Sequence, residues 1–405
     1  MPSPEPTDPL SWIENRTRSL RSQQQFRQLS IRQSPHVAGQ VQIAGHQLID
    51  FGSNDYLSLS ANPKLVDAVK ANAGYVGWGS AASPLIHGRG TLHARLERDL
   101  AKFEQTEAAL TFSSGFAANI GVIPAIAGAQ DVIFSDAKNH ASLIDGCRLS
   151  KAKTRIYPHN DIQSLRLLLE QEECCGSKLI VTDGLFSLDG DLARLPEIVQ
   201  LAQQHGAMLL VDEAHATGVF GEQGTGTCEH FGVKQDVQVV IGTLSKACGS
   251  HGGFVAGTQQ LIDWIANHAR SYIFSTAVPD ATCMASVTAL ELVSQMQKQR
   301  QDLLEAATAL RQQLTHHGFN VGHSESQIIP VILGQNSKVL DFQDRLLTKG
   351  FFVPAIRPPS VPQGESLLRI SLNSSHTPEM IDQLVEALVL ISSETGRSPT
   401  EPPAT

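Results

Sequence analysis

The chain has 405 residues, of which 41% are hydrophobic and 18% charged, and its formal net charge is −9. This size and balance describe a globular protein of two or three domains with a large buried core. The negative charge argues against nucleic acid as a partner, because phosphate backbones attract basic surfaces. No apolar stretch approaches the about 18 residues that a membrane span needs, so no contact with a membrane is expected.

The six cysteines contain no C-x-x-C pair. They therefore favour neither a metal site nor a disulfide framework, and a reducing cytoplasm fits them best. The segment from Met1 to Pro9 carries neither a basic nor an apolar stretch, so it does not have the pattern of a secretory signal.

Residues 1–52 read as an N-terminal arm and a hairpin. The spacing of apolar residues over 10–35 predicts an amphipathic helical arm, and residues 40–44 and 47–51 alternate like two strands around Gly45-His46. Pro63 then opens a short helix that reaches Asn72. The segment Gly77–Ala82 matches the dinucleotide-binding pattern G-x-G-x-x-A loosely. It follows a helix rather than a strand, so a turn is favoured.

Residues 53–290 read as a large α/β domain. From Thr91 onward, short apolar strands alternate with helices, which predicts a mainly parallel, seven-stranded sheet flanked by helices on both faces. The predicted strands are residues 109–112, 131–134, 154–157, 178–182, 207–211, 238–241 and 253–256. Ligands of such sheets bind outside the carboxyl ends of the strands.

Residues 291–395 read as a smaller C-terminal α+β domain. A long helical stretch over 280–316 leads into it, and its strands are predicted at 328–333, 352–356 and 367–372, with helices at 339–347 and 378–392. The tail 396–405 is rich in Pro, Ser and Thr and is expected to be disordered.

Polar residues follow several of the predicted strands. Ser113-Ser114-Gly115-Phe116 precedes a helix and is either a phosphate cradle or an ordinary helix cap. His140 can stack on a planar cofactor or cap the next helix, and the segment around Ser187 reads most simply as a turn. These segments leave the choice open.

Asp212 and Lys246 favour a cofactor site over ordinary turns and helix caps. Asp212 ends a buried apolar strand, where a carboxylate needs a cationic partner such as a protonated pyridine nitrogen. Lys246 follows another such strand, where an unpaired ammonium is unfavourable unless the amine is a neutral nucleophile or is bound to a cofactor. A magnesium–nucleotide site would need G-x-x-x-x-G-K-[ST], which the sequence lacks. The pair therefore indicates pyridoxal phosphate.

The chain resembles the α-oxoamine synthase family of fold-type I pyridoxal-phosphate enzymes over about residues 25–392. The motifs that carry the resemblance are Asn54-Asp55-Tyr56-Leu57, Ser114-Gly115-Phe116-Ala117-Ala118-Asn119, Asn139-His140-Ala141-Ser142, Asp212-Glu213-Ala214-His215-Ala216-Thr217-Gly218, Thr243-Leu244-Ser245-Lys246 and Phe274-Ser275-Thr276.

The resemblance implies a pyridoxal 5'-phosphate-dependent acyltransferase that acts as a homodimer with shared active sites. Lys246 would hold the cofactor and move a proton, Asp212 would pair with the pyridine nitrogen, and His140 would stack on the ring. The other implied contacts are His215 and Ser187 to the phenolic oxygen, Thr243, Gly115 and Phe116 to the phosphate, Ser275 or Thr276 to the phosphate from a second subunit, Arg357, Asn54 and His140 to the amino acid, and Arg27 and Ser360 to the acyl substrate.

Within the family, Ala355–Pro362 most resembles the biotin-pathway branch. That branch condenses L-alanine with a pimeloyl thioester of CoA or of an acyl carrier protein and releases CO2. A glycine- or serine-using relative stays open, as does a catalytically silent binding subunit, although the presence of Lys246 argues against the latter. The alanines and His87 within Ser80–Gly88, and Ser245 where relatives often carry glycine, bear on acyl-chain preference more than on the reaction.

Overall fold

The computed structural model describes residues 8–394, so the tail predicted at 396–405 lies outside the described residues. Its centre is the expected seven-stranded sheet, with strand order β4-β10-β9-β8-β7-β5-β6. All pairs are parallel except those of β10, which runs antiparallel to β4 and β9. The strands are β4 Ala108–Phe112, β5 Val132–Asp136, β6 Lys153–Tyr157, β7 Lys178–Asp183, β8 Met208–Asp212, β9 Val239–Thr243 and β10 Gly253–Gly257.

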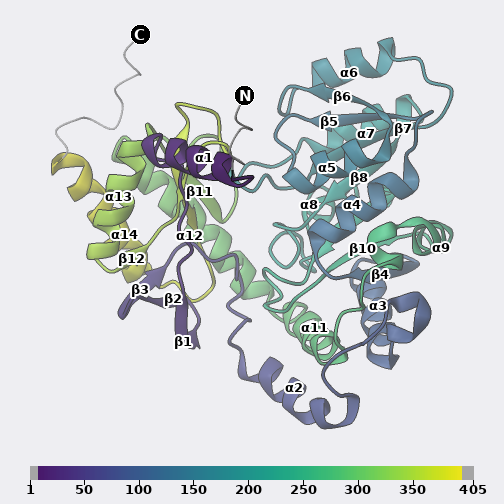
Figure 1. Ribbon diagram of the computed structural model, residues 1–405, viewed down its shortest axis with the longest axis horizontal. Coiled ribbons are helices and arrows are strands. Elements are labelled where there is room, and N and C mark those ends of the chain that lie inside the picture. Colours follow the sequence, from purple (N-terminus) through teal and green to yellow (C-terminus); the bar gives the residue numbers. More distant parts are fainter. Residues whose placement is uncertain (1–7, 395–405) are drawn as a thin grey trace, which may run out of the picture.

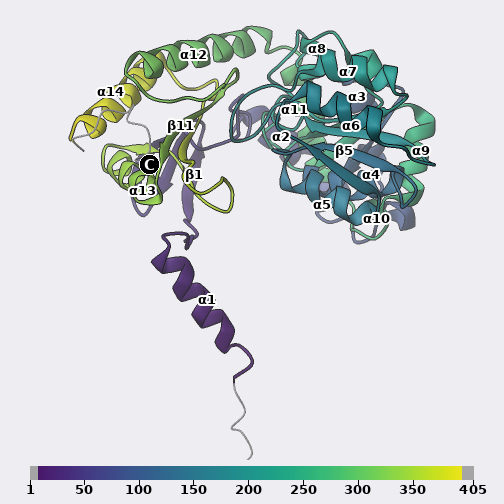
Figure 2. The ribbon, with the colours of Figure 1, turned by 90° about the horizontal axis from the view of Figure 1, so that it is seen from above.

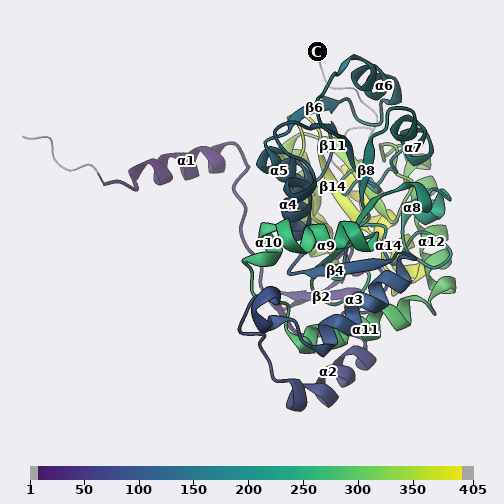
Figure 3. The same ribbon diagram turned by 90° about the vertical axis from the view of Figure 1, so that its right-hand side faces the viewer.

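Helices cover both faces of this sheet, as its continuous apolar strands require. Helices α4, α5, α9 and α10 pack on one face, and α6 and α7 pack on the other. In Figure 3, α4 and α5 lie on the left and α6 and α7 on the right. The helices of this part are α2 Pro63–Val76, α3 Thr91–Phe103, α4 Gly115–Ile126, α5 Ala141–Ser150, α6 Ile162–Gln171, α7 Leu195–Gln204, α8 Thr227–His230, α9 Gln259–His268, α10 Arg270–Ile273 and α11 Asp280–Val293, with a π-helix η1 at Pro84–Gly88 and a 3-10 helix η2 at Lys234–Asp236.

The C-terminal part is an α+β unit beside the large sheet (Figure 1). Its three-stranded sheet has the order β11-β14-β13. The predicted helical stretch over 280–316 divides into α11 and α12, and the predicted strand 352–356 divides into two short strands around Pro354, which has no N–H for a ladder. The elements are α12 Gln297–His316, β11 Ile328–Gly334, α13 Asn336–Thr348, β12 Phe351–Phe352, β13 Ala355–Ile356, β14 Ser366–Ser371 and α14 Pro378–Glu394.

The N-terminal residues form a second small sheet with order β1-β2-β3-β12. The hairpin of β2 Gln40–Ile43 and β3 His46–Asp50 is confirmed, and β1 Arg32–Val37 adds a strand where a helical arm was predicted. The helix α1 covers only Ser11–Ser22 and buries none of its residues. It extends away from the rest of the chain (Figure 2). Strand β12 pairs in parallel with β3, so the hairpin shares a sheet with the C-terminal part.

No helix among residues 8–394 has the length and apolar character needed to cross a bilayer. The feature of the fold that matters for function is the carboxyl edge of the large sheet. Asp183 at the end of β7 is in register with Asp212 at the end of β8, and Asp212 is in register with Ile241 of β9, two residues before Thr243. Three polar strand ends therefore meet at one edge.

Candidate functional site

Asp212 is a buried carboxylate without a cationic partner among the described residues. Its side chain is 4% exposed. Oδ2 accepts from Asn119 Nδ2 at 2.6 Å and Oδ1 accepts from the backbone N–H of Ala214 at 2.8 Å. These two bonds fix the orientation of the carboxylate but leave its charge uncompensated, which is unfavourable in a buried place. A protonated pyridine nitrogen would supply the missing charge.

Lys246 lies half-buried beyond the end of β9, and its Nζ forms no hydrogen bond or ion pair with another described residue. Burial lowers the pKa of Lys246 to about 8, although the nearby charge of Asp212 acts in the opposite direction. Roughly a tenth of the amine is therefore neutral near pH 7, far more than for an ordinary lysine, and the neutral form is the one that attacks an aldehyde. The donor set of Asp212 and Lys246 fits pyridoxal phosphate.

His215 lies in the turn after β8, and its Nδ1 is 2.7 Å from the hydroxyl of Tyr56. Burial, together with the charges of Lys246 and Arg369, lowers the pKa of His215 well below its usual range, so the ring is neutral. The single proton of the Tyr56 hydroxyl is donated either to Asn54 Oδ1, at 3.1 Å, or to His215 Nδ1. In the second case Nε2 carries the ring proton and can donate to a phenolic oxygen. The role of His215 at the phenolic oxygen stays a prediction.

His140 and Asp183 are hydrogen-bonded at the carboxyl edge of the large sheet. The backbone N–H of His140 donates to Asp183 Oδ2 at 2.6 Å, and His140 Nδ1 accepts from Ser142 at the start of α5. Burial and the neighbouring Asp212 raise the pKa of Asp183 well above its usual range. His140 is thus a helix cap, with an exposed ring that remains available to stack on a cofactor.

The start of α4 presents free backbone donors. Ser114 caps the helix by accepting from Ala117, and the N–H groups of Gly115 and Phe116 have no described acceptor. A Cβ added at Gly115 would lie 3.6 Å from Thr243 Cβ, so this turn adjoins the end of β9. Thr243 Oγ1 already donates to the Gly252 carbonyl, and Ser245 is exposed beside it. Free N–H groups at a helix start suit a phosphate.

Arg369 is the site residue that the sequence reasoning did not find. It lies within β14, is 7% exposed, and has no carboxylate partner among the described residues. Nε donates to the Ser187 carbonyl at 2.6 Å, and Nη1 donates to Asn54 Oδ1 at 3.0 Å. Its charge acts on Lys246 and His215, so it belongs to the same site.

Arg357 contacts the N-terminal arm, and its described hydrogen bonds do not join it to the sheet edge. Its Nη1 donates to the Gln24 carbonyl, and its Nε is buried without a partner. Arg27 donates to the Arg357 carbonyl at 3.3 Å and to Ser360 Oγ at 3.2 Å. The structure therefore joins Arg27, Arg357 and Ser360 into one group, and puts Arg369 rather than Arg357 beside Asn54.

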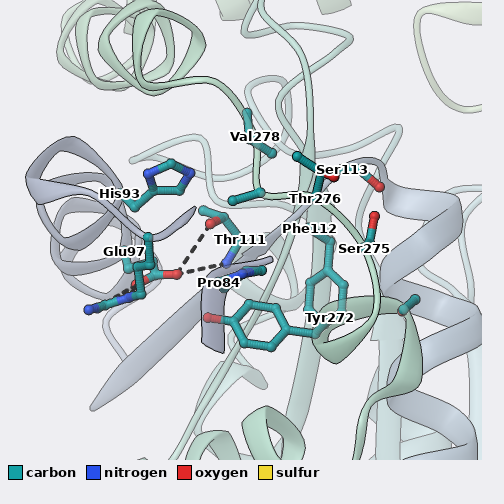
Figure 4. A pocket seen from close by; sticks show the side chains of 13 residues that line it. Pro84, His93, Glu97, Thr111, Phe112, Ser113, Tyr272, Ser275, Thr276 and Val278 are labelled. Atoms are coloured by element: carbon teal, nitrogen blue, oxygen red, sulfur yellow. Dashed lines mark hydrogen bonds and ion pairs between the residues drawn. The ribbon is translucent and has the colours of Figure 1, made fainter. Parts of the chain in front are cut away.

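Ser275 and Thr276 lie beside Phe112 and Ser113, at the end of β4 (Figure 4). With Ser113 they line a cavity of about 10 Å³, whose far wall contains Glu97 and Tyr272. Ser275 is half-buried and Thr276 is exposed. A second subunit is not part of the structure, so their contribution to a partner's phosphate site stays a prediction.

One group within residues 8–394 brings three possible metal ligands together. Ligand atoms of His93, Asp280 and Cys283 lie within 4.8 Å of one another. His93 Nδ1 is 3.1 Å from Asp280 Oδ1 and accepts from the backbone N–H of Gly90 at 3.2 Å. Through its contacts with Gly90 and Asp280, His93 serves as a cap at the start of α3.

The chain matches the family model described as aminotransferase class I and II over residues 46–388. It is 44% identical to 8-amino-7-oxononanoate synthase of Geobacter sulfurreducens, covering 94% of this chain and 99% of that protein. It is 44% identical to the enzyme of the same name from Trichlorobacter lovleyi, covering 96% and 99%.

Solved structures of related enzymes have the same fold as this chain. A serine palmitoyltransferase from S. paucimobilis with bound PLP superposes with a TM-score of 0.91 at 30% identity, covering 96% of this chain and 100% of that chain. An 8-amino-7-oxononanoate synthase from Francisella tularensis superposes with a TM-score of 0.74 at 30% identity, covering 86% and 98%. The chain belongs to the class I and II aminotransferase family of fold-type I pyridoxal-phosphate enzymes, among the 8-amino-7-oxononanoate synthases and their α-oxoamine synthase relatives.

Proposed function

We propose that the protein condenses L-alanine with a pimeloyl thioester, carried by CoA or by an acyl carrier protein, to give 8-amino-7-oxononanoate, CO2 and the free thiol. The names of its relatives at 44% identity support this reaction. The observation that carries the proposal is the edge where the unpaired carboxylate of Asp212, the amine of Lys246 with its pKa of about 8, and the unpaired guanidinium of Arg369 converge.

Pyridoxal phosphate, when bound, supplies an electron sink for negative charge at the α-carbon of an amino acid. Asp212 would keep the pyridine nitrogen protonated, since a proton there offsets the buried carboxylate charge. Lys246 would hold the cofactor, and its amine would take the α-proton of the amino acid. His215 and Ser187 would orient the phenolic oxygen, while Gly115, Phe116 and Thr243 would bind the phosphate.

Arg369 rather than Arg357 binds the carboxylate of alanine. Its Nε donates to the Ser187 carbonyl and its Nη1 to Asn54 Oδ1 and Ser371 Oγ, so the guanidinium is held in a fixed orientation. A guanidinium held in this way recognises a carboxylate with defined geometry. Because alanine loses this carboxylate as CO2, Arg369 must also release it after the carbon–carbon bond forms.

Arg27, Arg357 and Ser360 contact the acyl donor. The guanidinium groups of Arg27 and Arg357 lie close together without an acidic partner among the described residues. The pKa of Arg357 is lowered, mainly by burial and in addition by the positive charge of Arg27. An anion placed between them relieves their repulsion. A pimeloyl chain ends in a free carboxylate, which meets this requirement.

The enzyme works as a homodimer in the cytoplasm, with Thr276 or Ser275 completing the phosphate site of the partner subunit. Large apolar side chains that remain exposed in the single chain support a contact between copies. They include Trp78, Leu85, Ile86, Phe116 and Phe274, and segment 84–88 contacts α10 next to Thr276. The six cysteines are free, which suits a reducing compartment.

A second candidate is another α-oxoamine synthase, such as serine palmitoyltransferase or glycine C-acetyltransferase. The TM-score of 0.91 with serine palmitoyltransferase favours it. The deciding experiment supplies the holoenzyme with pimeloyl-CoA and with alanine, glycine or serine, and measures product mass. We expect 8-amino-7-oxononanoate from alanine, and a preference for glycine or serine would overturn the proposal.

A further inference from the structure

His159 bridges two buried carboxylates beside the site. It follows β6, the edge strand next to β5, and its side chain is 18% exposed. Nδ1 is 2.9 Å from Asp136 Oδ1 and Nε2 is 2.8 Å from Asp191 Oδ2. Asp136 ends β5, and Asp191 belongs to the segment between β7 and α7. His159 therefore joins two connections that rise from different strands.

Both ring nitrogens must donate to satisfy these two carboxylates, which only the protonated imidazole can do. Burial lowers the pKa of His159, but the hydrogen bonds with Asp136 and Asp191 outweigh it and raise the pKa to about 9. The ring is therefore a cation held between two anions. An amide side chain in its place would offer neither the charge nor two opposed donors.

The segment that His159 holds is compact and carries Ser187. The N–H of Phe186 donates to the Asp191 carbonyl at 3.0 Å, and the N–H of Gly190 donates to the Phe186 carbonyl at 2.9 Å. The Phe186 ring meets the His159 ring edge-on, with centroids 4.4 Å apart. His159 thus contacts this segment on both sides of Ser187.

The opposite side of the segment reaches the substrate machinery. The Ser187 carbonyl accepts from Arg369 Nε at 2.6 Å, and Asp189 pairs with Lys138 at 2.6 Å. Arg369 is also bonded to Asn54. A displacement of residues 184–192 would therefore move one of the contacts that orient the Arg369 guanidinium.

We propose that His159 is a positioning residue: by tying Asp136 to Asp191 it fixes segment 184–192, and through the Ser187 carbonyl it sets the orientation of Arg369. It touches neither cofactor nor substrate, and it acts on the amino acid rather than on the acyl donor. The inference rests on the proposed role of Arg369 in the same site. Preorganisation of this kind is what supporting residues contribute to a binding group.

The test compares His159→Asn with His46→Asn, a matched change at an exposed residue at the start of β3. We expect the KM for L-alanine to rise about tenfold in the holoenzyme of His159→Asn, with a smaller change in kcat and an unchanged KM for pimeloyl-CoA. His46→Asn should match the wild type. A purely structural role would lower the melting temperature and the active fraction without separating the two KM values.

Hydrogen exchange supplies a readout that does not depend on catalysis. In the protein without cofactor, the amides of residues 184–192 should exchange at least about tenfold faster in His159→Asn, while those of α6 stay unchanged. If His159→Asn does not fold, Asp191→Asn should show the same pattern to a smaller extent. Unchanged exchange in the variant that folds would overturn the proposal. A wild type that makes no product from alanine would overturn the proposed function instead.

Discussion

Two halves of the site are built in different ways. The sheet edge is made of Asp183, Asp212, Thr243 and Lys246. The first three are strand ends whose buried side chains are fixed by hydrogen bonds, and Lys246 lies half-buried just beyond them. The arginine turn, made of Arg27, Arg357 and Ser360, is held by contacts between segments more than 300 positions apart. The edge is suited to a cofactor that stays, and the turn to a substrate that arrives and leaves. Substitutions in the two halves should therefore affect different kinetic parameters.

The largest effect is expected at the sheet edge. Lys246→Ala should lower kcat on the order of 10⁴-fold or more, because it removes both the covalent anchor and the base. The absorbance of bound cofactor and product formation measure the two losses separately. Added methylamine should restore part of the rate, since it replaces the amine. Full turnover without added amine would contradict the assignment.

Arg369 tests which arginine belongs to the edge. Arg369→Gln should lower kcat/KM for L-alanine about 100-fold, because it removes a buried charged contact to the substrate carboxylate. The KM for pimeloyl-CoA should change little. Arg357→Gln is the matched control, and the assignment reverses if that variant, rather than Arg369→Gln, loses alanine binding.

Thr276 tests whether the edge is complete within one chain. Thr276→Asp should prevent phosphate binding by repulsion, and Lys246→Ala is inactive for its own reason. If sites are shared, mixing and reassembling the two variants creates dimers with one intact site, and about a quarter of wild-type activity should return. Activity measured after co-refolding decides the point, and no recovery would mean that each chain supplies its own Thr276.

The arginine turn should show a smaller and more selective effect. Arg357→Gln and Arg27→Gln should each raise the KM for pimeloyl-CoA about five- to tenfold, because one charge remains to bind the acyl carboxylate. Octanoyl-CoA has the same thioester end without the distal carboxylate, so its KM should not respond. An equal rise in the KM for octanoyl-CoA would contradict the proposed ion pair with the acyl carboxylate.

The smallest effect is a shift in pH dependence. The amine of Lys246 attacks only when neutral, so the rate of cofactor attachment to the cofactor-free protein should rise with pH and level off above about 8. Asp212 raises this pKa, so Asp212→Asn should move the midpoint to lower pH. Stopped-flow absorbance gives both profiles, and a midpoint that moves upward would contradict the arrangement of charges.

Asp212 and Lys246 of the sheet edge could be predicted because each ends or follows a buried strand, where a charge demands a chemical explanation. Arg369 offered the same signal, since it interrupts the apolar run Leu367, Leu368 and Ile370. The arginine turn could not be placed, because its contacts depend on how the arm meets a distant loop. Strand β1 was missed because it depends on its partner strand β2. The division at Pro354 could have been predicted, since a proline has no N–H for a ladder.

The pairing of β3 with β12 has a consequence for synthesis. Residues 46–50 leave the ribosome early, yet the strand that completes their sheet lies at residues 351–352. The large sheet, by contrast, is complete once residue 257 has emerged. The nascent chain can therefore assemble its catalytic edge while the N-terminal hairpin still has an open strand edge, which makes that hairpin the segment most in need of chaperone protection.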